Sequence, residues 1–348
     1  VSSSPVRTFT IGFHEKAFDE SPFARAVASH LGTEHTEVTL SADDALKFVP
    51  RLATLYDEPF ADSSALPTLL VSQVTRQFVT VALSGDAGDE LFGGYSQYVG
   101  RDTLMQFVRS VPRPVRGPLR AMAAPAGASL ALLSGRGQLQ GDLFTDRLRV
   151  LLATDMTHDV EYDSWLAMWP DSQRALSPAK RLELREQHRA LPAWPETGSW
   201  VESCMAYDVV SYLPDDILVK VDRAAMASSL ETRAPFLDHR IVEFALRQPL
   251  ASKIQGTTGK LLLRKLLARY IPTELFERPK RGFAVPMDQW LRGPLRDWVN
   301  DTLADDAVMR EWFNGKYLRR LWSAHLSGQS QTQRLWPALV LLQWLRSH

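Results

Sequence analysis

The first hundred residues alternate between short strand-like and helix-like patterns of hydrophobic positions. Residues 6–13 (VRTFTIGF) are β-branched and aromatic, which predicts a strand. Residues 21–31 open with Ser-Pro and then place apolar side chains at helical spacing, and Gly32 suits the position just after a helix. Residues 34–40 alternate as a half-buried strand does. The chain therefore begins as strand, helix, strand.

The next segments extend this alternation. Ser41 and Asp44 have the spacing of a capping box, which predicts the start of another helix. A further helix is expected over residues 65–77, followed at residues 78–83 (FVTVAL) by an apolar run typical of a parallel strand covered on both faces. This order predicts an α/β fold with a parallel, doubly wound sheet.

The remainder of the chain has a different pattern. From about residue 101 to residue 348, helical periodicity interrupted by prolines dominates, and no run is typical of a strand. We therefore expect an α/β nucleotide-binding part over about residues 1–100 and a mostly helical part over residues 101–348.

Composition excludes several classes of protein. Forty Lys and Arg balance forty Asp and Glu, so the formal net charge is zero and a nucleic-acid-binding surface is not favoured. No apolar run is long enough to span a bilayer, so no membrane partner is expected. The one cysteine, Cys204, indicates a reducing compartment and a core position, and we expect a cytoplasmic protein. The opening VSSSP without Met suggests a fragment.

Residues 84–95 (SGDAGDELFGGY) carry the candidate chemistry. They follow the predicted strand at residues 78–83, so they lie where open α/β sheets bind ligands. Glycines let backbone amides approach a ligand, while Asp86, Asp89 and Glu90 supply oxygen ligands suited to Mg²⁺ held against phosphates. An acidic turn whose aspartates cap the next helix would contain the same residues. Neither GxGxxG nor GxxxxGK[ST] is present, which excludes the usual dinucleotide and Walker loops.

With these features the chain resembles the synthetase half of the glutamine-hydrolysing asparagine synthetase family, an ATP-pyrophosphatase fold of the adenine nucleotide alpha hydrolase type. The resemblance rests on five blocks in family order: residues 9–13 (FTIGF), 56–64 (YDEPFADSS), 84–95, 222–226 (DRAAM) with 231–238 (ETRAPFLD), and 278–283 (RPKRGF). It implies a synthetase domain over residues 1–348, truncated at its N-terminus.

The resemblance also implies an ATP and Mg²⁺ site. It assigns the adenine edge to Ile11 and the adenosine to Ser84 and Gly85, while Asp89 matches a metal-binding acid. Mg²⁺ at that position would neutralise charge that develops as pyrophosphate leaves.

Two residues are expected to act in catalysis. Asp86 matches the family's acid for acyl-adenylate formation, which is Glu in some members, and it is a candidate acid/base group. Lys280 matches a late phosphate-contacting lysine. For a lone RPKR sequence a solvated basic loop would be the simpler interpretation, but its place after the other blocks favours the phosphate contact.

Substrate contacts are expected at Asp62, Ser63 and Ser64, and at Arg223. Helix capping explains the first three equally well. The charged residues of the fourth block would also suit a buried structural ion-pair network: Asp222, Arg223, Glu231, Arg233 and Asp238.

The implied reaction is ATP-dependent amidation of aspartate to asparagine through β-aspartyl-AMP. Ammonia would come from glutamine through a glutaminase domain that this sequence lacks, as it lacks the family's SGGxDS phosphate loop, so we expect the fragment alone to be inactive. Alternatives are amidation of a sugar precursor or another carboxylate, ring closure as in β-lactam synthetases, and a non-catalytic pseudoenzyme scaffold. A homodimer is possible.

Overall fold

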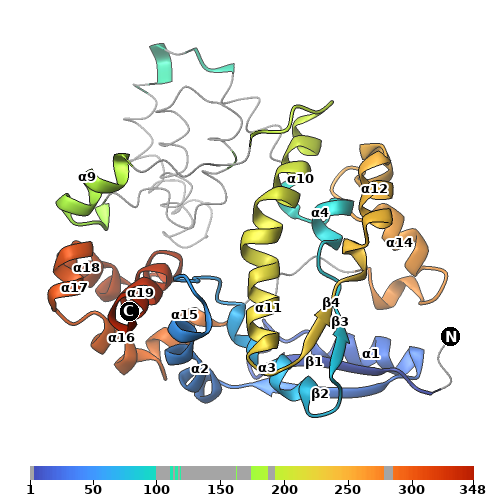
Figure 1. Ribbon diagram of the computed structural model, residues 1–348, viewed down its shortest axis with the longest axis horizontal. Coiled ribbons are helices and arrows are strands. Elements are labelled where there is room, and N and C mark those ends of the chain that lie inside the picture. The colour runs from blue at the N-terminus through green and yellow to red at the C-terminus, as the bar shows by residue number, and fades with distance from the viewer. Residues whose placement is uncertain are drawn as a thin grey trace. The chain divides into compact units, whose positions relative to one another are not determined.

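The computed structural model describes residues 4–98, 174–186, 193–277 and 285–348, together with residues 110–112, 114–116, 118 and 162 (Figure 1). The chain forms two compact units, and each combines several segments. The first unit contains residues 1–51, 62–102 and 195–286, and the second contains residues 52–61, 103–194 and 287–348.

The first unit is a mixture of short parallel strands and helices. Its strands are β1 (Arg7–Phe13), β2 (Glu34–Leu40), β3 (Val81–Leu83) and β4 (Glu231–Arg233). Its helices are α1 (Ser21–Leu31), α3 (Ala65–Arg76), α4 (Gly88–Phe92), α10 (Trp200–Val210), α11 (Val219–Met226), α12 (His239–Arg247), α13 (Leu250–Lys253) and α14 (Leu261–Leu267). Helix α2 (Ala42–Leu55) begins in this unit and ends in the second. Short turns complete the unit: the π-helical turn η3 (Leu213–Leu218) and the 3₁₀ turns η1 (Ser96–Tyr98), η4 (Pro235–Leu237) and η5 (Thr273–Leu275).

Within this unit the strands form two parallel pairs. β1 pairs with β2, with Ile11 opposite Val38, and β3 pairs with β4, with Ala82 opposite Thr232. Helices α1 and α3 pack on the β1–β2 pair, and α11 packs against α3 and β4. The described residues thus confirm a mixed α/β fold with small parallel sheets.

Two predictions about strands were wrong. The strand expected over residues 78–83 is shortened to β3, and its Val81 and Leu83 side chains are 42% and 74% exposed, so it is not covered on both faces. A strand also occurs in the part expected to lack one, namely β4. Its sequence, Glu-Thr-Arg, has no apolar run, so its strand conformation depends on pairing with β3.

The sequence signals for the ends of two helices predicted the structure correctly. Helix α1 starts at Ser21 with Pro in its first turn and ends at Gly32, whose φ of 65° is left-handed. The Ser41 hydroxyl accepts a hydrogen bond from the Asp44 amide at 3.1 Å, and the Asp44 carboxylate accepts one from the Ser41 amide at 3.2 Å. These reciprocal bonds confirm the capping box at the start of α2.

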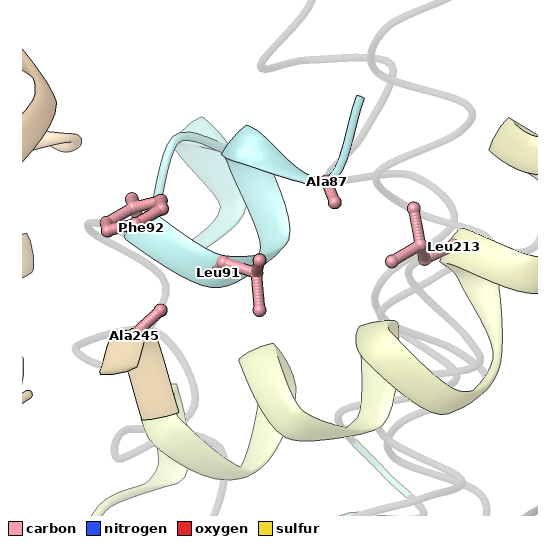
Figure 2. Close-up of a cluster of buried hydrophobic side chains, with 5 residues drawn as sticks. All are labelled: Ala87, Leu91, Phe92, Leu213 and Ala245. Carbon is pink, nitrogen blue, oxygen red and sulfur yellow. The ribbon is translucent and has the colours of Figure 1, made fainter. Parts of the chain in front are cut away.

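A small hydrophobic cluster fixes the position of α4. Figure 2 shows Ala87, Leu91 and Phe92 of the α4 segment with Leu213 and Ala245, and all five side chains are buried. Phe236 packs on this cluster, with its ring centroid 5.8 Å from that of Phe92. Because one face of α4 is buried in this way, the loop before it is held in place.

The described part of the second unit is helical. Its helices are α9 (Pro178–Glu186), α15 (Met287–Arg292), α16 (Arg296–Thr302), α17 (Ala307–Trp312), α18 (Gly315–Leu326) and α19 (Thr332–Ser347). Trp290 of α15 and Trp336 of α19 are among its largest fully buried side chains. No helix in the described ranges combines the length and apolar character that a membrane span requires.

Candidate functional site

The acidic loop begins as a direct continuation of β3. The Ser84 amide donates to the Arg233 carbonyl at 2.9 Å, which extends the pairing with β4 by one residue. A turn follows, in which the Gly88 amide donates to the Gly85 carbonyl at 3.3 Å and Ala87 has a left-handed φ of 69°. A non-glycine residue in that region is unusual and is held there by surrounding structure. The loop is therefore a tight turn at the carboxyl end of a parallel strand.

Ser84, Gly85 and Asp86 lie together at the start of this turn. The Ser84 hydroxyl donates to the Asp86 carboxylate at 2.7 Å. Gly85 is exposed, and a Cβ placed on it would meet nothing within 4 Å, so its backbone is open to approach. Helix α4 has Ala87 at its N-cap and no side-chain capping bond, so the interpretation of the aspartates as caps is wrong.

Asp89 is paired with a lysine from a distant part of the chain. Lys260 Nζ lies 2.9 Å from Asp89 Oδ2, and both side chains are partly exposed. A Cβ on Gly94 would lie 2.0 Å from Asp89 Oδ1 and 2.3 Å from Lys260 Cε. A Cβ on Gly259 would lie 2.0 Å from the Gly93 carbonyl oxygen. The glycines thus allow the loop and the segment before α14 to approach closely.

Glu90 is the buried acid of the loop. It is only 2% exposed and accepts a hydrogen bond from the Tyr95 hydroxyl at 2.6 Å. Burial raises the pKa of Glu90, although the Tyr95 hydrogen bond opposes that shift, and burial also raises the pKa of Tyr95. The Tyr95 ring contacts those of Tyr98 and Tyr212, with centroids 5.6 and 5.9 Å away. Glu90 therefore belongs to a buried polar and aromatic network, whereas Asp86 and Asp89 remain partly exposed.

The segment predicted to contact substrate contains a second ion pair. Lys220 Nζ of α11 lies 2.7 Å from Asp62 Oδ2. Asp62 also accepts hydrogen bonds from the Ser64 amide and hydroxyl, each at 2.8 Å. Burial alone would raise the pKa of Asp62, but the Lys220 charge and these hydrogen bonds lower it. The Ser64 side chain makes no capping bond to α3, so Asp62 orders the turn before the helix and joins it to α11.

Ile11 lies on the other strand pair. Its side chain is buried in β1, and a predicted contact with adenine would use its backbone. The neighbouring Gly12 is crowded, because a Cβ there would lie 2.9 Å from Asp19 Oδ1. Asp19 accepts hydrogen bonds from the amides of Ser21 and Phe13, at 3.0 and 3.4 Å. Gly12 thus allows β1 to approach the turn that starts α1.

The predicted buried ion-pair network is wrong. Asp222, Arg223, Glu231 and Arg233 are exposed, and the last two form a surface pair at 3.4 Å. Asp238 caps α12 through the Arg240 amide at 2.9 Å and pairs with the Arg240 guanidinium, which lowers the pKa of Asp238. The helical and turn spacing of these residues therefore belongs to charges on the surface, not to a buried network. Arg223 remains a predicted substrate contact, and Lys280 lies outside the described residues.

Two lysines at the site were not identified from the sequence. Lys260 has no local signal, because its partner lies 171 positions away. Lys220 lies 158 positions from Asp62, and its spacing of four residues from Asp216 indicates a local pair, not the pair with Asp62.

Comparisons with known proteins identify the family. Residues 1–346 match the family model described as asparagine synthase. A Mycobacterium bovis protein named "Putative asparagine synthetase (glutamine-hydrolyzing)" is 32% identical over 342 residues, which are 97% of this chain and 50% of that protein. "Asparagine synthetase (glutamine-hydrolyzing) 1" of Bacillus subtilis is 27% identical over 350 residues, 97% of this chain and 52% of that protein. "Amidase chry2" of Gibberella zeae is 23% identical over 314 residues, 86% of this chain and 46% of that protein. The chain spans about half the length of these relatives.

A family match over nearly the whole chain, together with an acidic loop at the end of a parallel strand, shows that this chain belongs to the asparagine synthase family.

Proposed function

We propose that the full-length protein carrying this chain uses ATP to activate the side-chain carboxylate of aspartate and transfers ammonia to it, which yields asparagine. Family membership supports a ligase that amidates a carboxylate. The observation that carries the assignment to a site is the loop after β3, where Ser84 orients Asp86 and Lys260 orients Asp89.

The reaction needs two displacements. A carboxylate oxygen is a poor leaving group, so the aspartate carboxylate first attacks the α-phosphorus of ATP. The bond to the β-phosphate breaks, and pyrophosphate leaves. Ammonia then attacks the acyl carbon, AMP leaves with the bonding electron pair, and the new amide nitrogen loses a proton. Positioning the reactants and neutralising charge are the main tasks of such a site.

The loop residues have distinct roles in this proposal. Gly85 offers an open backbone to the adenosine, and the backbone of Ile11 in β1 would contact the adenine edge. Asp86 is the acid/base group, and the Ser84 hydroxyl holds its carboxylate in one orientation. Lys280 contacts the phosphates from outside the described residues. Lys260 fixes Asp89, which limits the reorganisation that a charged ligand would require.

The donor set near Asp89 fits Mg²⁺ bound together with ATP. In the described ranges no group of three or more His, Cys, Asp or Glu side chains could hold a metal ion by itself. Mg²⁺, however, commonly binds one or two carboxylates and completes its shell with phosphate oxygens and water. Asp89 would hold the ion, which when bound would neutralise phosphate charge.

Ammonia would come from glutamine through another part of the protein. Both asparagine synthetase relatives named above carry "glutamine-hydrolyzing" in their names and are about twice as long as the matched region. Asp62, Ser63, Ser64 and Arg223 would contact the amino-acid acceptor.

A second candidate is amidation of a different carboxylate on the same site. The match to "Amidase chry2" of Gibberella zeae favours this alternative. The retained Asp86 and Asp89 argue against a non-catalytic scaffold. Both candidate functions share adenylation chemistry, so the identity of the carboxylate acceptor distinguishes them.

Isotope transfer tests the proposal. Aspartate labelled with ¹⁸O in its side-chain carboxylate should pass one labelled oxygen to AMP when incubated with ATP, Mg²⁺ and ammonia. Labelled AMP and asparagine appearing together are the expected result. Unlabelled AMP, or turnover with another carboxylate only, would contradict the assignment to aspartate.

A further inference from the structure

A third ionisable group completes the cluster around Asp62. Asp216 lies in the π-helical turn η3, four residues before Lys220, and both side chains interact with Asp62. The Asp62 and Asp216 carboxyl groups lie close enough to interact directly, and this contact raises the pKa of Asp216. The other oxygen of Asp216, Oδ1, is buried and has no hydrogen-bond partner in the described part of the chain.

The composition of this cluster, two acids and one lysine, favours a bound proton. Two adjacent buried carboxyl groups can hydrogen-bond to each other only when one of them is protonated, and ionising both would place two like charges side by side. Lys220 supplies one positive charge for two acids, and it contacts Asp62 directly. Burial raises the pKa of Asp216 to about 7, and the Asp62 charge adds to the shift while Lys220 opposes it. Asp62 is therefore the ionised partner, and Asp216 holds the proton.

The surrounding groups do not change this balance. Tyr212 precedes η3, and its pKa is raised by burial and by the charges of Asp216, Asp62, Glu90 and Asp208. A tyrosine with a raised pKa is neutral at physiological pH. In the part of the chain that the structure describes, the groups that act on Asp216 are thus Asp62, Lys220 and a neutral Tyr212, and Lys220 is the cation among these three.

We propose that Asp216 is a positioning residue whose proton, shared with Asp62, holds Asp62 in its contacts with Lys220 and Ser64 and thereby shapes the acceptor pocket. The inference rests on the proposed function, which assigns residues 62–64 to that pocket. When the proton leaves, two adjacent carboxylates face one lysine, and their repulsion displaces Asp62 from the turn before α3.

The test is the pH dependence of the KM for aspartate in pyrophosphate exchange by the full-length protein. In the wild type the KM should rise by about threefold or more between about pH 6 and about pH 8, as one charge contact is lost. Asp216→Asn should have a flat profile, because the amide is uncharged and still donates to Asp62. Asp215→Asn is the matched control at the exposed neighbouring position, and it should follow the wild type.

The result that would overturn the inference is an Asp216→Asn protein with the same pH profile as the wild type. Pyrophosphate exchange by the wild type tests the proposed function separately. An unchanged pH profile in Asp216→Asn would therefore contradict only the role of Asp216.

Infrared spectroscopy gives a second measurement that does not depend on activity, and its decisive result comes from the wild type. The wild type should show the carbonyl stretch of a protonated carboxylic acid that disappears as the pH rises through about 7. Asp62→Asn should lose that band, because Asp216 then becomes the counter-ion of Lys220. A wild type without a titrating band would overturn the shared proton.

Discussion

Lys260 Nζ lies 2.9 Å from Asp89 Oδ2, although 171 positions separate the two residues along the chain. The amide of Lys260 also donates to the Phe92 carbonyl at 3.0 Å, so backbone and side chain both join the start of α14 to the acidic loop. The orientation of the predicted metal-binding carboxylate is therefore set by a segment far away in the sequence.

Removal of this lysine should impair adenylation. Lys260→Ala removes the ammonium group that orients Asp89, and the resulting misplacement should slow aspartate-dependent pyrophosphate exchange by about tenfold to a hundredfold. Lys265→Ala, at an exposed position on α14, is the matched control and should retain wild-type exchange. Equal exchange rates for the wild type and both variants would show that the Asp89–Lys260 pair has no role in adenylation.

The close approach of the loop to Lys260 predicts a strict requirement for glycine. Gly94→Ala places a Cβ 2.0 Å from Asp89 Oδ1, so the ion pair must move. We expect the free energy of unfolding to fall by about 1–3 kcal/mol, the usual effect of overpacking, when measured by denaturant titration.

Gly85→Ala provides the comparison for stability, because a Cβ at that position meets nothing within 4 Å. Its free energy of unfolding should stay within about 0.5 kcal/mol of the wild type. A Gly94→Ala protein as stable as Gly85→Ala would show that the loop does not pack against Lys260 in this way.

Lys280 is predicted to contact the phosphates of ATP. Lys280→Ala should slow pyrophosphate exchange by about 10²-fold, the scale of losing one preorganised charge contact. Lys316→Ala, at an exposed position near the start of α18, controls for the loss of a positive charge. Wild-type exchange by Lys280→Ala would make residues 278–283 a solvated basic loop.

The burial of His325 should make the stability of the second unit depend on pH. Its ring is buried, and Nδ1 accepts a hydrogen bond from the Gln331 amide at 3.0 Å. Burial lowers the pKa of His325, and the Arg292 charge lowers it further. Below the unfolded pKa of about 6.5 the unfolded chain therefore binds a proton that the folded ring does not, so stability should decrease as the pH falls through that value.

The measurement is the melting temperature at about pH 7.5 and about pH 5.5. His325→Gln should show a smaller decrease on acidification than the wild type, whereas His348→Gln, at the exposed end of the chain, should match the wild type. An undiminished decrease in His325→Gln would assign the acid sensitivity to other groups.

Features set by neighbouring residues could be predicted from the sequence. Gly32 ends α1, and Ser41 with Asp44 caps α2, because both signals depend on contacts within a few residues. The pairing of β3 with β4 could not be predicted. It joins segments far apart in the chain, and β4 has two charged residues among three. A doubly wound sheet was inferred from the order of elements, which does not determine how strands pair.

The same limit applies to the site. The loop at residues 84–95 and its place at the end of a strand were visible, because glycines and acids follow the apolar run directly. The lysines that hold Asp62 and Asp89 were missed, since each approaches from a distant helix or helix start. The exposure of Glu231 and Arg233 was also missed, because helical and turn spacing suits a surface ion pair as well as a buried one.

Exchange of labelled pyrophosphate into ATP by the full-length protein tests the proposed adenylation of aspartate directly. This exchange requires reversible adenylation of the acceptor and needs no ammonia source. We predict exchange that depends on both aspartate and Mg²⁺. Exchange that ignores aspartate but responds to another carboxylate, or no exchange with any carboxylate, would contradict the proposal.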